Sequence, residues 1–95
     1  MSERLTDAAV RAALTDLPSW GLVDGKLQRD LRFADFSEAL AFLVRVGLEA
    51  EKRNHHPELT NVYSRVTVQL TTHDAGGITE KDVDLAAAID AIAGA

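Results

Sequence analysis

Hydrophobic and polar positions divide the chain into helical and extended stretches. The first helical stretch carries apolar residues with helical spacing between positions 8 and 17. Thr6 or Asp7 can cap its free backbone N–H groups, because both side chains carry an oxygen that accepts hydrogen bonds. Pro18 disfavours α geometry in the residue before it, so the pattern predicts that this helix ends there.

Two further stretches are predicted to be helical. Ser37 is the expected cap of a helix whose apolar positions, 40–48, keep helical spacing and which runs to about Arg53. The last helix follows Thr79, which together with Asp82 resembles a capping box with Asp in place of Glu. The apolar stripe of this helix consists of Val83, Leu85, Ala86, Ile89 and Ile92.

Extended segments separate these helices. A short apolar run at 20–23 is followed by Asp24-Gly25, which supplies the left-handed turn geometry of a two-residue hairpin. The second strand of that hairpin is predicted to run from Lys26 to Phe33. Arg29 interrupts its alternation, which predicts that this strand lies at an edge of the sheet or has an exposed end.

The segment after Pro57 has strand character as far as Thr72. Its expected buried face consists of Val62, Val66, Val68 and Leu70. One long strand and a hairpin that turns near Asn61 both fit this pattern. In either case, the order of elements predicts an α+β domain in which helices pack on one face of an antiparallel sheet.

Composition limits the kinds of function. The 95 residues, 46% of them hydrophobic, suit one domain over 1–95. The net charge of −5 argues against non-specific binding to nucleic acid, and no run of residues approaches the ~18 apolar residues of a membrane span. The absence of cysteine excludes disulfides and thiol chemistry. Residues 1–7 lack the pattern of a secretory signal. We therefore expect a cytoplasmic domain without a nucleic-acid or membrane partner.

The three histidines are the clearest candidates for chemistry. His55, His56 and His73 all lie in the second half of the chain, and imidazole is the side chain best suited to move protons near neutral pH. Glu51 lies one helical turn before His55 and could orient that ring. A solvated pair at the end of a helix is the simpler explanation, and the residues alone favour it.

A metal site is not expected from these residues. Adjacent side chains on an extended segment point to opposite sides, so His55 and His56 are poorly placed to share one ion. The chain has no H-E-x-x-H helix and no cysteine to complete a zinc site. Gly76-Gly77 lacks the Lys-Ser/Thr that follows a phosphate-binding loop, and a turn explains it.

Four segments of the second half form a spaced motif. An acid, then His-His-Pro, then Tyr and then His follow one another at intervals of three, five and nine residues, and Asp82 extends the series. The segments are Glu51-Lys52-Arg53-Asn54-His55-His56-Pro57-Glu58, Asn61-Val62-Tyr63, Leu70-Thr71-Thr72-His73 and Gly77-Ile78-Thr79-x-x-Asp82. This motif resembles that of the pterin-4a-carbinolamine dehydratase family, and the similarity covers roughly Leu17 to Ala95.

The resemblance implies an activity. Enzymes of this family dehydrate 4a-hydroxytetrahydropterins such as 4a-hydroxytetrahydrobiopterin to the quinonoid dihydropterin, in the recycling of tetrahydropterin. The reaction needs an acid for the departing oxygen and a base for the N5 proton, with no metal or redox cofactor. Two alternatives remain: binding of a pterin without turnover, and an interaction module, since animal members also serve as dimerisation cofactors for a homeodomain transcription factor.

The resemblance also implies the site. It assigns catalysis to His55, His56 and His73, supported by Glu51, with His55 and His73 moving protons and His56 mainly binding. The residues implied to hold the pterin are His55, His56, Pro57, Thr72, His73, Asp74 and Ala75. One departure is Leu59, where animal members carry tryptophan; an aliphatic side chain cannot stack on a pterin, so the shape of the pocket can differ.

A shared pocket has consequences for the fold. A straight strand from Asn61 to Thr71 would be ~33 Å long, at ~3.3 Å per residue, and would separate His73 from His55. The chain must therefore reverse, most simply around 61–64, with Tyr63 at the turn in a structural role. The resulting fold is a four-stranded antiparallel sheet with three helices on one face. This fold leaves either the other face of the sheet or a strand edge uncovered, and members of the family are dimers or tetramers. Both points predict a homo-oligomer in which the sheets of neighbouring subunits extend or face one another.

Overall fold

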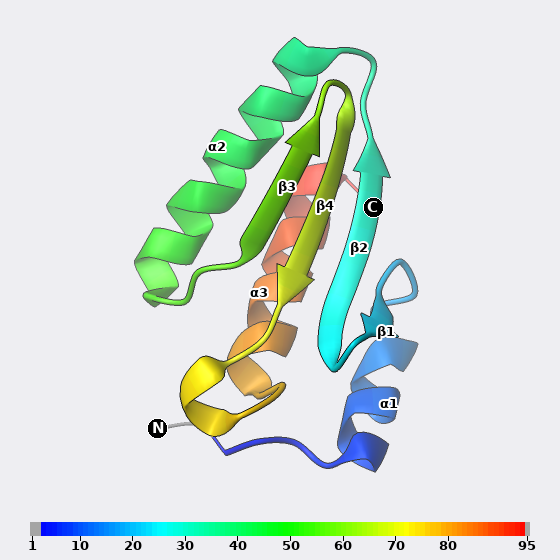
Figure 1. Cartoon of the computed structure of the whole chain (residues 1–95), viewed down its shortest axis with the longest axis vertical. Coiled ribbons are helices and arrows are strands. Elements are labelled where there is room, and N and C mark those ends of the chain that lie inside the picture. Colours follow the sequence, from blue (N-terminus) through cyan, green and yellow to red (C-terminus); the bar gives the residue numbers. More distant parts are fainter. Residues whose placement is uncertain (1–2, 95) are drawn as a thin grey trace.

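The structure, a computed structural model, describes residues 3–94 (Figure 1). Positions 1, 2 and 95 of the predicted domain lie outside the described residues. In chain order the elements are α1 (Asp7–Thr15), β1 (Gly21–Val23), β2 (Lys26–Arg32), α2 (Phe36–Arg53), β3 (Glu58–Val62), β4 (Arg65–Leu70), the 3-10 turn η1 (His73–Ala75) and α3 (Glu80–Ala93).

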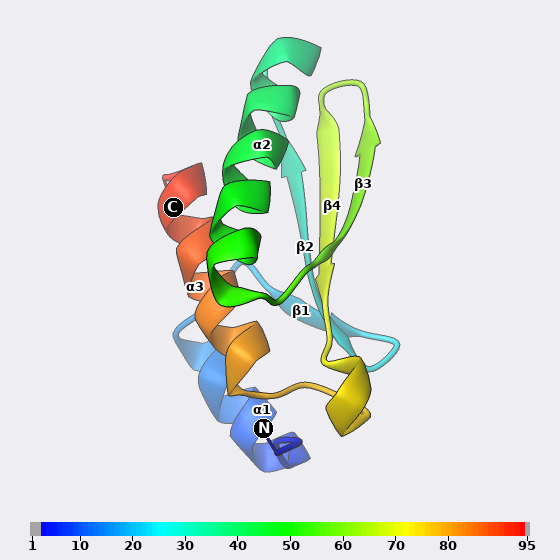
Figure 2. The same ribbon diagram turned by 90° about the vertical axis from the view of Figure 1, so that its left-hand side faces the viewer.

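The four strands form one antiparallel sheet with the order β1-β2-β4-β3. Figure 2 shows the sheet almost edge-on, with the three helices on one side of it. The predicted α+β class, with three helices on one face of a four-stranded sheet, is confirmed. The reversal expected around 61–64 is also present, because Val62 pairs with Arg65 across a turn formed by Tyr63 and Ser64.

The hydrophobic core lies between the sheet and the two longer helices. Alternate residues of β4 face the core, and residues three or four apart on α2 and α3 meet them, as the two periods require. The buried side chains of this layer are Leu27, Ala39, Phe42, Val46, Ala50, Val66, Val68, Leu70, Leu85, Ala86 and Ile89. Each of the larger ones stabilises the fold by about 1.5–3 kcal/mol relative to an exposed position.

Of the two alternatives predicted for the second strand, the edge position is wrong, whereas its C-terminal end, with Asp30 and Arg32, is exposed. Strand β2 lies between β1 and β4. Arg29 faces the helices, and its Nη1 forms an ion pair with Asp90 of α3. Trp20 Nε1 donates a hydrogen bond of 2.8 Å to the same carboxylate. A partly buried ion pair can replace an apolar side chain at a position that faces the helices, and this explains the interruption.

The predicted burial of Val62 is also wrong. Val62 is exposed, whereas Val66, Val68 and Leu70 are buried as expected. Val62 and Arg65 are opposite each other in the hairpin and therefore share the outer face. Because the turn contains two residues, the face of the sheet on which even-numbered residues lie changes between β3 and β4.

Helix caps were largely predictable. Thr6 caps α1, and Thr79 and Asp82 form the expected capping box of α3. The cap of α2 is Asp35 rather than Ser37, because the Asp35 carboxylate accepts a 2.8 Å hydrogen bond from the backbone N–H of Glu38.

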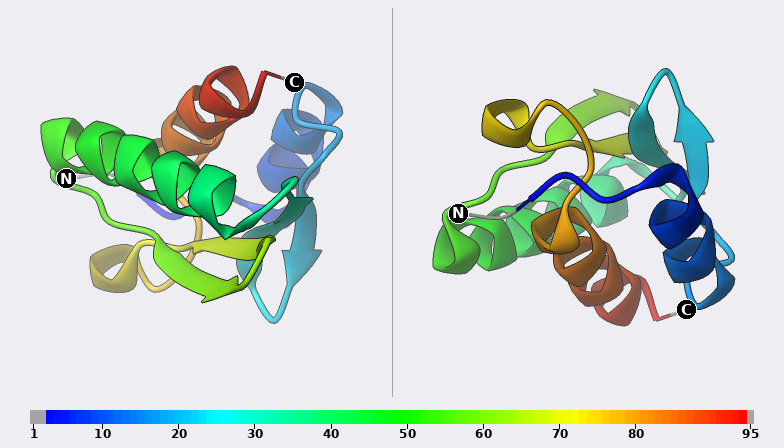
Figure 3. Two further views of the ribbon diagram at one scale, coloured as in Figure 1. Left: turned by 90° about the horizontal axis from the view of Figure 1, so that it is seen from above. Right: turned by 90° about the horizontal axis from the view of Figure 1, so that it is seen from below.

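The segment that precedes α1 crosses the molecule near the start of α3 (Figure 3, right). There the N–H of Leu5 donates to the carbonyl of Ile78 at 2.8 Å. This bond joins the beginning of the described chain to the loop that leads into α3. No helix within residues 3–94 has the length and apolar character needed to cross a membrane.

Candidate active site

The end of α2 places two of the histidines. Asn54 ends this helix in the left-handed conformation, with φ of 48°, and its N–H bonds to the carbonyl oxygens of Ala50 and Glu51. Asparagine adopts this conformation more readily than most residues. Pro57 then favours extended geometry in the residue before it. The chain therefore leaves the helix abruptly, and His55 and His56 lie between α2 and β3.

The end of β4 places the third histidine. Beyond Leu70, Thr72 pairs with Gly77 in an isolated bridge, so the intervening residues form a short closed loop. Within it, η1 carries His73, and Gly76 closes the turn with φ of 71°, a conformation that favours glycine. The loop holds His73 at the end of the sheet from which α3 begins.

These two chain segments border one cleft of about 270 Å³. Its lining residues are Asn54, His55, His56, Thr71, Thr72, His73, Asp74 and Lys81. The three histidines are thus brought together, with Thr72 and Asp74 of the expected binding set. Pro57 and Ala75 do not line the cleft. A larger hollow, about 840 Å³ between α2 and α3, has no histidine in its lining.

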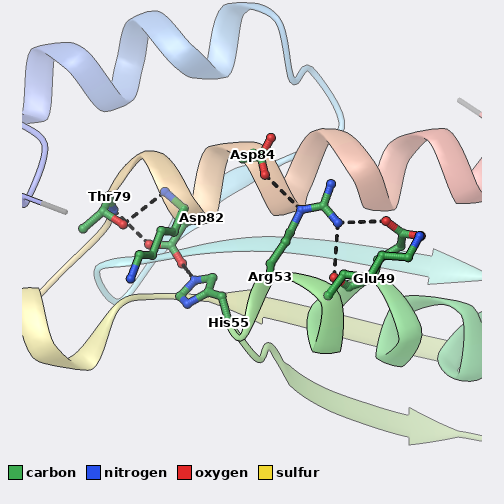
Figure 4. Close-up of polar contacts among 8 residues, drawn as sticks. Glu49, Arg53, His55, Thr79, Asp82 and Asp84 are labelled. Carbon is green, nitrogen blue, oxygen red and sulfur yellow. Dashed lines mark hydrogen bonds and ion pairs between the residues drawn. The ribbon is translucent and has the colours of Figure 1, made fainter. Parts of the chain in front are cut away.

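The most buried polar contact of the cleft joins His55 to Asp82. His55 Nε2 and Asp82 Oδ1 are 2.6 Å apart, and the carboxylate is 0% exposed (Figure 4). The other carboxylate oxygen accepts from Thr72 Oγ1 at 2.7 Å and from the N–H of Thr79 at 2.9 Å. Asp82 therefore joins α3, the end of β4 and the segment after α2.

Glu51 contacts a different histidine from the expected one. Its Oε1 lies 2.6 Å from His56 Nε2, in a pair whose side chains are 77% and 57% exposed. The predicted pairing with His55 assumed that the helix continues through that residue. Because α2 ends at Asn54, His55 leaves the helical path and no longer lies one turn from Glu51.

A charged pair joins the first residue of β2 to the first residue of β3. Lys26 Nζ and Glu58 Oε2 are 2.6 Å apart. This hydrogen bond holds the pKa of Glu58 below its ordinary value of 4.5, and the positive charge of His73 has the same, smaller effect.

The arrangement is suited to acid–base chemistry. The cleft presents three imidazoles, and two of them contact a carboxylate, which can orient a ring and stabilise its protonated form. Among residues 3–94, no group of three or more His, Asp or Glu side chains is arranged to hold a metal ion.

Sequence reasoning missed four features of this cleft. Asn54, Thr71 and Lys81 line it, and Asp82 contacts His55. The fixed distance of Asp82 from the histidines was a usable signal, but its spacing also fitted a helix cap. No local pattern distinguished Lys81 from other exposed lysines.

Comparison with known proteins places this geometry in a family. The family "Pterin 4 alpha carbinolamine dehydratase" matches residues 3–92. A curated protein of Solibacter usitatus, named as a pterin-4-alpha-carbinolamine dehydratase, is 50% identical over 93 residues, which cover 98% of each chain. A protein of the same name from Rhodopseudomonas palustris strain BisB18 is 54% identical over 95 residues, covering 98% of this chain and 94% of its own.

A solved structure gives the same result. The crystal structure of a transcriptional coactivator/pterin dehydratase from Brucella melitensis superposes with a TM-score of 0.93 at 45% sequence identity. The match covers 97% of this chain and all of that one. Fold, motif and full-length similarity agree, and the chain therefore belongs to the pterin-4-alpha-carbinolamine dehydratase family.

Proposed function

We propose that this protein dehydrates 4a-hydroxytetrahydropterins, among them 4a-hydroxytetrahydrobiopterin, to the quinonoid dihydropterin in tetrahydropterin recycling. The observation that carries the proposal is the single cleft in which His55, His56 and His73 meet, although they come from two separate chain segments. Its volume of about 270 Å³ is close to the lower end of the ~300–1,000 Å³ typical of ligand sites. A cleft of this size suits a small bicyclic substrate.

The reaction requires two proton movements. The C4a–O bond breaks, and the departing hydroxyl takes a proton from an acid and leaves as water. N5 gives its proton to a base, and the electron pair of the N–H bond forms the double bond between N5 and C4a. The protein thus ends with the same number of protons, and no electron is exchanged with a cofactor. We therefore propose that catalysis needs neither a metal nor a redox cofactor.

The environments of the histidines support different roles. We assign proton transfer to His55 and His73. His55 is mostly buried and is held by a carboxylate, which supports a role in proton transfer. His56 is more exposed and is paired with Glu51, which suits a contact that binds the substrate. Binding contacts are further proposed for Pro57, Thr72, Asp74 and Ala75.

A direct assay tests the proposal. Freshly generated 4a-hydroxytetrahydropterin dehydrates without a catalyst, so the appearance of quinonoid dihydropterin is followed by absorbance with and without the protein. We expect the rate to rise in proportion to the protein concentration. An unchanged rate, with binding of the pterin detected by calorimetry, would show that the cleft binds without turnover.

The alternative is an interaction module. The Brucella melitensis relative is described as a transcriptional coactivator as well as a pterin dehydratase. A purely structural module would need neither the three histidines nor a buried carboxylate beside one of them. These features favour the enzyme.

We further infer that the protein forms a homo-oligomer. Leu40, Val44 and Leu48 on α2 are 47–60% exposed and lie four residues apart, so they form one apolar stripe. A two-fold axis near Val44 would place Leu40 of one copy against Leu48 of the other, so the stripe complements itself. The expected contact between sheets remains a second possible interface. A cytoplasmic location without a nucleic-acid or membrane partner is part of the same proposal.

A further inference from the structure

Asp82 has no part in the two proton movements described above, although its carboxylate is the most deeply buried charged group beside the cleft. It is 0% exposed, and the described residues occupy both of its oxygens. Because the side chain is fully buried, its oxygens are not accessible to a substrate. Its contact with His55 is the route by which it can influence the reaction.

The hydrogen bonds around Asp82 have one consistent direction. The backbone N–H of Lys81 donates to Thr79 Oγ1, whose hydroxyl lies 2.8 Å from Thr72 Oγ1. Thr72 in turn donates its hydroxyl proton to Asp82 Oδ2. The N–H of Thr79, which can only donate, reaches the same oxygen. Asp82 is thus the acceptor at the end of the chain, as an ionised carboxylate must be.

The same reasoning applies to the other oxygen. An ionised carboxylate cannot donate, so with Asp82 ionised the 2.6 Å contact places a proton on His55 Nε2. His55 Nδ1 has no hydrogen-bond partner among the described residues. Every buried side-chain nitrogen or oxygen atom of these residues does have a partner. Nδ1 is therefore accessible to solvent, on a ring that lines the cleft.

We propose that Asp82 is a positioning residue which holds neutral His55 with its proton on Nε2 and leaves Nδ1 to exchange a proton with the substrate; this inference rests on the proposed function. The second ring nitrogen then carries a lone pair and can act as the base. In the protonated ring, the same atom is the donor. Both forms keep the contact with Asp82.

The position of Asp82 in the fold explains how the orientation of the His55 ring is fixed. Asp82 completes the capping box of α3, and the Thr72–Thr79 contact joins that cap to the end of β4. Formation of the helix cap therefore also sets the orientation of the catalytic ring. By contrast, the pair of Glu51 and His56 is exposed on both sides, so solvent can replace the carboxylate there.

The test is the tautomer of His55, read from long-range nitrogen–proton NMR spectra at about pH 9, well above the ~6.5 at which an unperturbed imidazole titrates. We expect the Nε2–H form in the unmodified protein. In Asp82→Asn, the amide oxygen can still accept from Thr79 and Thr72, while the amide NH₂ donates to Nε2 and moves the ring proton to Nδ1. We expect kcat to fall by ~10²–10⁴-fold, with a much smaller change in KM.

Asp35→Asn is the matched control, because it makes the same chemical change at the exposed cap of α2. It should alter neither the His55 spectrum nor kcat. An Nδ1–H tautomer in the unmodified protein would overturn the proposal, and this result does not depend on the folding of any variant. Unchanged turnover of Asp82→Asn would also overturn it. If the unmodified protein shows no dehydration, the proposed function fails, whereas the tautomer still decides whether Asp82 orients the ring.

Discussion

At the scale of single residues, the three histidines differ in what surrounds them. His55 is held by the buried carboxylate of Asp82, His56 has an exposed partner, and His73 lies on η1 at the cleft. The three imidazoles thus differ in access to solvent, because His55 is buried whereas His56 and His73 are exposed. The environment of His55 supports its proposed role in proton transfer, whereas the role of His73 is proposed from the family resemblance.

Single replacements of the proton-transfer residues test these roles. Replacing His55 or His73 by Ala should lower kcat by ~10²–10⁴-fold, because positioned acid–base groups contribute about that much. Replacing His56 by Ala should mainly raise KM. Steady-state kinetics gives both parameters, and circular dichroism confirms folding. Turnover close to that of the unmodified protein in both the His55 and His73 variants would refute the assignment.

A pH effect follows from the ion pair of Lys26 and Glu58. The Lys26 ammonium lowers the pKa of Glu58 below 4.5 in the folded protein. The pair therefore stabilises the fold above that value, and this contribution disappears as the pH falls through the folded pKa. The carboxyl carbon of Glu58, followed by NMR, should titrate below pH 4.5. Its midpoint should rise in Lys26→Met, and high salt should weaken the effect because the pair is exposed. An unchanged midpoint in that variant would contradict the stated cause.

At the scale of secondary-structure elements, the cleft is made by element ends. Helix α2 ends in a left-handed Asn54, and η1 ends in a left-handed Gly76. The chain therefore turns sharply next to His55 and at the end of the turn that carries His73. Helix α3 contributes its first turn, with the cap at Thr79. The rigid sheet and helices thus support a site formed by short connections.

The cap of α3 should matter more than an ordinary cap. Thr79→Ala removes a buried hydroxyl that accepts from Lys81 and contacts Thr72. Loss of a cap costs about 0.5–2 kcal/mol, and we expect the upper part of that range here. Asp35→Ala, at the exposed cap of α2, should cost less. Denaturant unfolding of both variants gives the comparison, and an equal or smaller loss for Thr79→Ala would show that its buried contacts add nothing.

At the scale of the whole molecule, the apolar stripe of α2 is the clearest unpaired surface. The outer face of the sheet has polar cross-strand pairs, such as Gln28 with Gln69 and Asp30 with Thr67. The stripe consists of Leu40, Val44 and Leu48. A contiguous apolar surface of this kind is typical of contact between subunits.

Sedimentation equilibrium at micromolar concentration tests assembly. We expect at least twice the chain mass of 10.3 kDa. A mass near 10.3 kDa that does not change on concentration would refute the homo-oligomer. Val44→Glu introduces a charge at the centre of the stripe and should yield monomers, because burial of an unpaired charge is costly. The exposed Thr15→Glu, on α1, is the control and should leave the mass unchanged. If Val44→Glu also remains oligomeric, the interface lies elsewhere, with the sheet edges as the next candidates.

Chelation tests whether turnover depends on a metal ion. Turnover should survive exhaustive treatment with EDTA, because the proposed proton transfers use imidazoles rather than a Lewis acid. Activity is compared before and after chelation in the same assay. Loss of activity, with recovery on addition of zinc, would require a metal-dependent mechanism.

Much of the fold could be predicted from local patterns. Helical spacing indicated the three helices, and Thr6 and Thr79 marked two of their starts. Asp24-Gly25 marked the first hairpin. These features depend on residues a few positions apart, and the chain encodes such neighbours directly. The second hairpin was ambiguous from alternation alone, since a strand and a hairpin share the period of two, and only the resemblance decided between them.

The sequence by itself thus determined the periodic elements, most caps and the set of histidines. Tertiary structure alone decided which carboxylate contacts which imidazole: Asp82 meets His55 from 27 positions away, and Glu51 meets His56. Tertiary structure also decided that Arg29 faces the helices, where it pairs with Asp90. Such pairings depend on where α2 ends and on how α3 packs against the sheet. Asp82 becomes a neighbour of His55 only after the chain has reversed direction. Glu51 meets His56 rather than His55 because the helix ends between Glu51 and these histidines.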